Sequence, residues 1–134
     1  MTESLQVLIY LILWTMALAA IAPMYRSVLV MSGKRTADSF PRSGHECPDW
    51  CKRVLDAHAN AIENLPLYIG VFVAAYASSK VNILDQIACY YLFARIAQSV
   101  VHLAGINHYL VLARFTFWIV QIALLAYAAI QLLM

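Results

Sequence analysis

Residues 81–105 read VNILDQIACYYLFARIAQSVVHLAG, and this stretch decides the fold. Its length and apolar character predict a helix that crosses a lipid bilayer, which takes about 20 mostly apolar residues. Arg95 lies in the middle of the span, where insertion scales assign a charged side chain a cost of about 2.5–3.5 kcal/mol. Gln98, Ser99 and His102 follow at intervals that place all four side chains on one helix face. A polar stripe inside a membrane span indicates a functional site with partners on neighbouring helices.

The composition of the whole chain is also typical of a membrane protein. Of the 134 residues, 63% are hydrophobic and 12% are charged, whereas soluble domains are about 25% charged. The mean hydropathy is +0.73. This length has room for four spans and short loops but excludes a large domain outside the membrane. The net charge of +2 indicates no binding of nucleic acid, and three scattered cysteines indicate no disulfide framework.

The hydropathy pattern predicts an all-α membrane protein with one domain, residues 1–134, built as a bundle of four transmembrane helices. The predicted spans are residues 5–24, 54–77, 83–104 and 110–134. The only substantial polar segment is the loop at residues 25–53. Six of the nine basic residues fall in or beside this loop, so the positive-inside rule places it in the cytoplasm. Because no targeting extension is visible, the expected location is the bacterial inner membrane.

Two other spans carry polar stripes with the same helical spacing. Asp56, Asn60 and Glu63 lie on one face of the second span, and Arg114, Trp118 and Gln121 lie on one face of the fourth. We expect the three stripes to face one another. Glu63 and Arg95 are then the natural ion pair, and removal of one partner from such a buried pair costs about 3–5 kcal/mol.

These buried polar groups have two interpretations. They can hold the helices together, since polar side chains form hydrogen bonds between membrane helices. They can also form a binding site, because one ion pair leaves Arg114, His102, Asn60 and Asp56 unexplained. A cationic pocket bounded by Arg95, Arg114 and Arg53 would suit a small anionic ligand whose carboxylates the guanidinium groups can hold.

The residues of these stripes resemble a known family. Residues 53–66, RVLDAHANAIENLP, resemble the second helix of the membrane-associated proteins in eicosanoid and glutathione metabolism, the MAPEG family. Residues 94–105, ARIAQSVVHLAG, look like the third helix of that family, and Arg114 with Trp118 is similar to the start of its fourth. The resemblance covers about residues 50 to 122 and is closest to the bacterial branch, with a relation to the microsomal glutathione transferases.

The resemblance implies a homotrimer that binds glutathione between adjacent subunits near the cytoplasmic side, with lipophilic electrophiles or hydroperoxides entering from the bilayer. The glutathione-binding positions that it implies are Arg53, Asn60, Glu63, Arg95, Gln98 and Arg114. Four positions depart from the eicosanoid enzymes. Asp56 and Ala59 stand where those enzymes carry arginines, and His102 and Trp118 stand where they carry tyrosines.

The implied chemistry is attack by a glutathione thiolate on a lipophilic electrophile, because a cationic pocket favours the thiolate form. Arg114 is the expected catalytic residue that stabilises the thiolate, with Arg95 as an alternative. His102 is the second expected catalytic residue, which either polarises the thiol or accepts its proton.

Two other functions are open. One is a noncatalytic MAPEG-like protein that binds lipid or a partner protein, which the missing arginines at positions 56 and 59 favour. The other is a small transporter or channel, since charged stripes within a membrane also line ion paths.

No metal site is expected. The segment HECPDWC at residues 45–51 offers His45, Cys47 and Cys51 as at most three soft ligands, whereas a structural zinc site takes four. From the membrane spans and the family resemblance, the expected partners are further copies of the chain, membrane lipids and a lipophilic small molecule.

Overall fold

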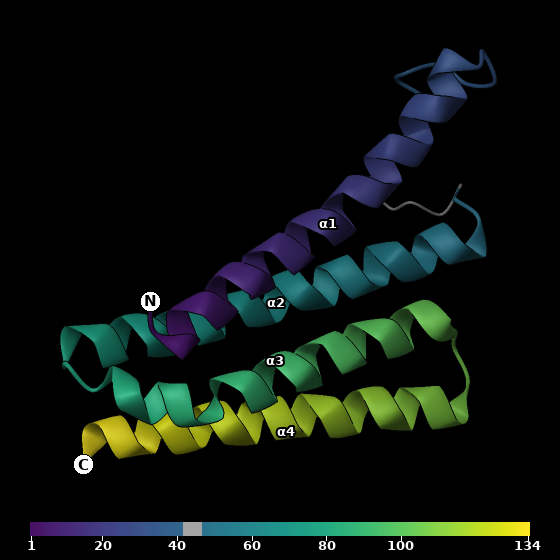
Figure 1. The fold of residues 1–134 in the computed structure, drawn as a ribbon. Coiled ribbons are helices and arrows are strands. Elements are labelled where there is room, and N and C mark those ends of the chain that lie inside the picture. The colour runs from purple at the N-terminus through teal and green to yellow at the C-terminus, as the bar shows by residue number, and fades with distance from the viewer. Residues whose placement is uncertain (42–46) are drawn as a thin grey trace.

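The computed structural model describes residues 1–41 and 47–134, which form four α-helices (Figure 1). The helices are α1 (Glu3–Met31), α2 (Asp49–Ala77), α3 (Val81–Ala104) and α4 (His108–Leu133). No strand occurs among the described residues. The prediction of an all-α, four-helix fold is thus confirmed.

The first two helices are longer than the predicted spans. α1 does not end near Met24 but continues through Pro23 to Met31, because a proline removes only one internal hydrogen bond and the residues after it are mostly apolar. α2 begins at Asp49, directly after Pro48. Pro48 has extended backbone angles, and a proline disfavours the helical conformation in the residue before it, so the helix cannot begin earlier in the chain.

Three helices, α1, α3 and α4, are long and apolar enough to cross a membrane. Their exposed surfaces carry large apolar side chains such as Leu13, Phe93 and Ile130, which suit contact with lipid. α2 does not meet the same criterion, because polar side chains occupy its first half. That α2 also spans the membrane therefore stays a prediction.

α2 and α3 form the centre of the bundle. α1 packs against both of them on one side, and α4 packs against both on the other (Figure 1). Small residues allow the close approach of α1 and α2, since Leu18 packs on Ala57 and Ala61, and Ala22 packs on Cys51. In a membrane, the hydrophobic effect does not drive helices together, because lipid is as apolar as leucine. Small residues instead favour helix association by allowing close van der Waals packing.

The two ends of the bundle differ. The loop end holds the C-terminus of α1, the N-terminus of α2 and the turn at Gly105 between α3 and α4. Gly105 has a φ of +155°, a backbone conformation that favours glycine. The terminal end holds both chain termini and the turn between α2 and α3, where the Lys80 ammonium donates a hydrogen bond to the Leu132 carbonyl at 3.2 Å.

At the terminal end, three helices meet around Ser4. The Ser4 backbone N–H donates to Asp85 Oδ1 of α3 at 2.8 Å, and the Tyr68 hydroxyl of α2 donates to the Ser4 carbonyl at 3.0 Å. Tyr68 is fully buried and its ring packs at a tilt of 38° against that of Tyr91, with ring centroids 4.9 Å apart. Because a helix N-terminus leaves its first N–H groups without internal partners, Asp85 caps α1 from another helix.

We expect Asp85→Ala to lower the free energy of unfolding by about 1 kcal/mol, the usual cost of losing a cap. Asp85→Asn keeps an acceptor oxygen and should retain most of the stability. Thermal unfolding in detergent, followed by circular dichroism, measures both. Equal melting temperatures for wild type and Asp85→Ala would show that the cap does not hold α1 in place.

Candidate functional site

The polar stripe of α3 faces the interior of the bundle. Arg95 is 3% exposed, Gln98 and Ser99 are buried, and His102 is 9% exposed. All four lie in the half of α3 that leads to the loop end. Polar side chains from the other helices meet this stripe and form a polar layer inside the bundle. We call this layer, made of Asn60, Arg95, Gln98, Ser99, His102, Arg114 and Gln121, the polar layer.

Asn60 of α2 is the partner of Arg95. The guanidinium Nη2 of Arg95 donates a hydrogen bond to Asn60 Oδ1. Glu63, one turn further along α2, is exposed on the surface of the chain. The predicted Glu63–Arg95 ion pair does not form in the single chain, because α2 turns Asn60 rather than Glu63 toward α3.

The guanidinium of Arg95 is left with unused hydrogen-bonding capacity. Its Nε and Nη1 atoms are buried and have no hydrogen-bond partner among the described residues. An amide oxygen is a weak match for a buried charge, and a buried guanidinium normally binds a carboxylate or several acceptors. The polar layer therefore holds a cation that lacks an anionic partner within the described chain.

Two glutamines join α3 to α4 beside this cation. Gln121 Nε2 donates to Gln98 Oε1 at 2.7 Å and to the Phe117 carbonyl at 3.0 Å. Gln121 is 1% exposed, and its Oε1 is buried with no partner among the described residues. The layer thus presents an unused acceptor as well as unused donors, so a ligand or water with both kinds of group can bind there.

Arg114 and His102 form the part of the layer nearest the loop end. Arg114 Nη1 lies 3.0 Å from His102 Nδ1. An arginine can only donate a hydrogen bond, so His102 Nδ1 accepts it and the ring hydrogen lies on Nε2. The arrangement fixes the imidazole and turns its N–H toward other groups, which favours polarisation of a thiol over acceptance of its proton.

Arg53 holds the end of α3. Its Nε donates to the Leu103 carbonyl at 3.0 Å, which satisfies one of the terminal carbonyls of that helix. Arg53 also lines an open cavity of about 320 Å³ together with Asp49, Lys52 and Ile106. The cavity lies at the loop end, between the first turns of α2 and the turn after α3.

Trp14 is a member of the neighbourhood that sequence reasoning missed. Its indole Nε1 donates to Ser99 Oγ at 3.0 Å, and Ser99 Oγ donates to the Arg95 carbonyl at 3.2 Å. An indole N–H within an apolar span needs an acceptor on a neighbouring helix, and this requirement is the signal that could have indicated Trp14. Gln121 was visible in its stripe but was not among the predicted site residues.

The possible metal ligands cannot be placed together. His45 and Glu46 lie outside the described residues, and Cys47 and Cys51 are buried against Ala22 of α1. Within residues 1–41 and 47–134, no group of three or more His, Cys, Asp or Glu side chains has the arrangement of a metal site.

A family model described as the MAPEG family matches residues 4–134. No curated protein matches the chain. Since the family match spans nearly the whole chain, the protein belongs to the MAPEG family and is an integral membrane protein of that helical type.

Asn60→Ala should destabilise the fold, because it leaves Arg95 without its hydrogen bond in the interior. A hydrogen bond to a charged group contributes about 1.5–3 kcal/mol, and we expect a loss of that size in the free energy of unfolding. Asn60→Asp retains an acceptor at the same place and supplies a negative charge. Chemical denaturation in detergent should rank wild type and Asn60→Asp above Asn60→Ala; the reverse order for the two variants would contradict the assignment.

Proposed function

We propose that this MAPEG-family protein binds glutathione at its polar layer and transfers the thiol to lipophilic electrophiles or reduces lipophilic hydroperoxides. The observation that carries the proposal is the buried Arg95 guanidinium, two of whose nitrogens have no hydrogen-bond partner among residues 1–41 and 47–134. Glutathione carries two carboxylates, and a carboxylate is the group that such a guanidinium binds best.

The described residues divide into two groups with different tasks. Asn60, Arg95 and Gln98 lie deeper in the bundle and hold the peptide part of glutathione by its carboxylates and amides. Arg114 and His102 lie 3.0 Å apart nearer the loop end and face the thiol. Arg53 and Glu63 contribute further contacts at the margin, where the glutathione ammonium pairs with the Glu63 carboxylate.

The reaction begins when the thiol loses its proton to water at the loop end. The positive charge of Arg114 stabilises the resulting thiolate, and the His102 Nε2–H donates to the sulfur. The thiolate attacks the electrophilic carbon, a thioether bond forms, and the leaving group departs. With a hydroperoxide, the thiolate attacks the terminal oxygen, so that an S–O bond forms as the O–O bond breaks and the alkoxide takes up a proton to leave as an alcohol. A second glutathione thiol then reacts with the resulting sulfenic acid and gives the disulfide and water.

Calorimetry with detergent-purified protein tests the binding step. Glutathione should bind saturably to wild type and to the control Lys80→Gln, whose side chain lies at the terminal end. Arg95→Met and Asn60→Ala should weaken binding by about tenfold or more, since each removes a contact worth about 1.4 kcal/mol or more to a charged group. Absence of binding to wild type at millimolar glutathione would overturn the proposal and favour a noncatalytic protein that binds lipid.

Turnover of 1-chloro-2,4-dinitrobenzene with glutathione tests the role of Arg114. We expect Arg114→Ala to lower kcat by about a hundredfold, as for other losses of a preorganised charge-stabilising group, while glutathione binding changes less. Normal turnover by Arg114→Ala would show that another group stabilises the thiolate.

We infer further that three copies assemble through the exposed face of α2, with the loop of residues 32–48 in the cytoplasm of a bacterial cell. This face carries Asp56, Ala59, Glu63 and Gly70, all exposed in the single chain. Acidic side chains are costly against lipid, whereas small residues favour close helix contact. Assembly would cover both kinds of residue and would bring Glu63 of one copy toward a neighbouring polar layer.

Gly70→Leu tests the assembly directly. A side chain added at Gly70 meets no atom of the described residues within 4 Å, and replacing a helical glycine usually stabilises a helix. A loss of the trimer in native mass spectrometry would therefore report contact with another copy. A trimer that survives Gly70→Leu unchanged would show that this face lies against lipid.

A further inference from the structure

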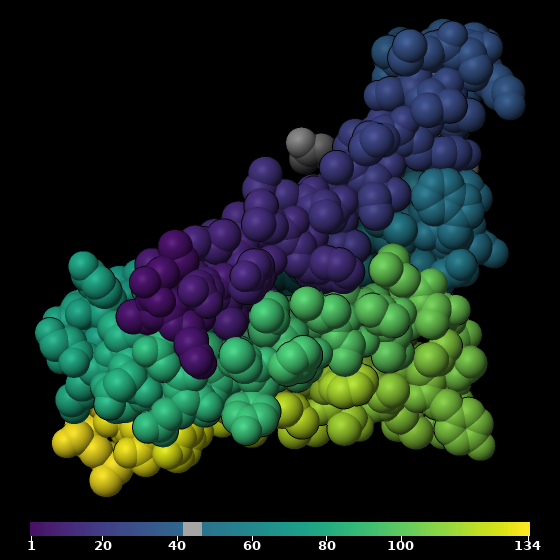
Figure 2. Space-filling model, viewed as in Figure 1, coloured from purple at the N-terminus to yellow at the C-terminus, as the bar shows by residue number. Residues whose placement is uncertain are grey.

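The end of α1 extends beyond the rest of the bundle, as Figures 1 and 2 show. Tyr25 makes an edge contact with Trp50 in the first turn of α2, with ring centroids 5.0 Å apart. The residues of α1 after Tyr25 lie past the start of α2. The 29 residues of α1 correspond to about 43 Å of helix, longer than the hydrocarbon core of about 30 Å. Tyrosine and tryptophan prefer the membrane surface, so this pair marks the headgroup level.

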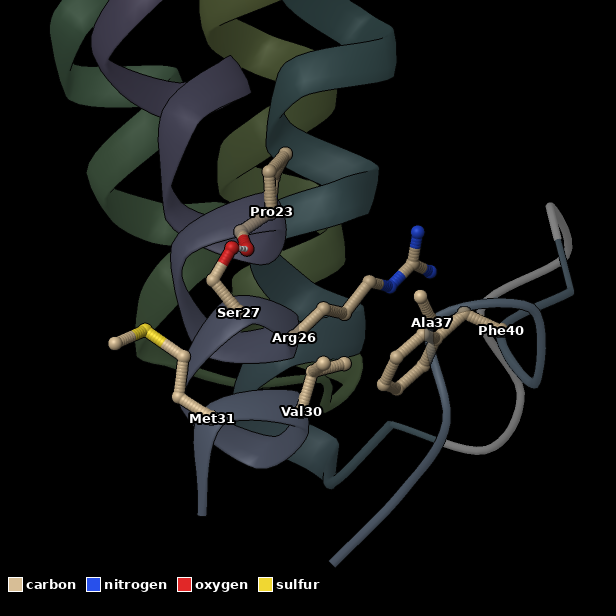
Figure 3. Close-up of a pocket in the computed structure, with 7 residues that line it drawn as sticks. All are labelled: Pro23, Arg26, Ser27, Val30, Met31, Ala37 and Phe40. Atoms are coloured by element: carbon tan, nitrogen blue, oxygen red, sulfur yellow. Dashed lines mark hydrogen bonds between the residues drawn. The ribbon is translucent and has the colours of Figure 1, made fainter. Parts of the chain in front are cut away.

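An open groove of about 530 Å³ lies at this level, between the end of α1 and the loop that follows it. Val30 and Met31 contribute apolar surface from α1, and Ala37 and Phe40 contribute apolar surface from the loop (Figure 3). The groove extends along α1 to Pro23, which precedes Tyr25 and lies on the membrane side of the aromatic pair. It therefore crosses from the hydrocarbon region into the headgroup region.

Two guanidinium groups flank the ring at the edge of this groove. The Arg26 guanidinium carbon lies 5.4 Å from the centroid of the Phe40 ring, and that of Arg35 lies 4.7 Å from it. Arg35 also donates to the Ser39 carbonyl within the loop at 2.6 Å, and Arg26 Nη2 of α1 donates to the Pro41 carbonyl at 3.4 Å, which ties the loop back to the helix. Phe40 thus fixes two arginines at the mouth of an apolar groove, and the exposed Lys34 adds a third cation nearby.

We propose that this groove binds one anionic phospholipid, with its phosphate at Arg26 and Arg35. The glycerol region lies against Phe40, and the acyl chains run past Pro23 toward the hydrocarbon region. Two observations favour a lipid. The groove joins an apolar wall to a cationic edge at the level where a phospholipid does the same, and the adjoining face of α1 exposes Met24 by 66% and Val28 by 64%. Juxtamembrane lysines and arginines attract anionic headgroups in this way. The site is separate from the polar layer and does not depend on glutathione binding.

Native mass spectrometry of the full protein with added phosphatidylglycerol or phosphatidylcholine tests this proposal. Wild type should retain one phosphatidylglycerol per chain after delipidation and should bind phosphatidylcholine more weakly. Arg26→Gln with Arg35→Gln should lower phosphatidylglycerol affinity by about 25-fold, because each cation near an anionic headgroup contributes about fivefold. Lys52→Gln is the matched control, since it removes an exposed cation at the same end but outside the groove.

A second variant keeps the proposal testable where the arginine changes unfold the loop. Ala37→Trp fills the groove without altering the charge and should remove the retained lipid, while circular dichroism shows an unchanged helix content. Equal retention of both lipids by wild type, or phosphatidylglycerol binding that survives both variants, would overturn the proposal. Efficient disulfide cross-linking of Met31→Cys between two copies would also overturn it, because a second copy would then occupy the groove.

Discussion

The structure depends on one constraint, the removal of the Arg95 guanidinium from water at the centre of an apolar bundle. A charge in that place must be surrounded by polar atoms, since solvation lost to hydrocarbon is not otherwise replaced. Asn60 meets part of this requirement by accepting from the guanidinium, and at the same level Ser99 donates to the Arg95 backbone carbonyl while Gln98 is held by Gln121. α2, α3 and α4 are aligned at this level because their polar groups must meet.

The helices and their order follow from the sequence because long apolar stretches and stops such as Pro48 and Gly105 act locally. The ends of α1 and α2 were predicted less well. The first span was predicted to end at residue 24, just after Pro23, yet the helix passes through this proline, since groups from neighbouring side chains and helices can satisfy the backbone carbonyl that a proline frees. Whether a proline ends a helix is decided by its surroundings, which a hydropathy pattern does not contain.

The sequence predicted which residues belong to the polar layer better than it predicted which of them pair with one another. Helical spacing placed Arg95, Gln98 and His102 on one face, and the structure buries all three. Charge complementarity suggested Glu63 as the partner of Arg95, but the structure gives that place to Asn60. Which of two residues one turn apart faces α3 depends on the rotation of α2 about its axis. Packing at Ala57 and Ala61 sets that rotation, and periodicity alone cannot resolve it.

The link from Trp14 through Ser99 to the backbone of Arg95 gives the protein an optical signal of its own. Trp50 and Trp118 are 42% and 38% exposed, whereas Trp14 is tied by its indole N–H to the helix that carries the buried cation. Indole emission responds to hydrogen bonding and to nearby charge. An anion that binds beside Arg95 would therefore alter the fluorescence of Trp14 without any label, so a change in tryptophan emission would report that the polar layer is occupied.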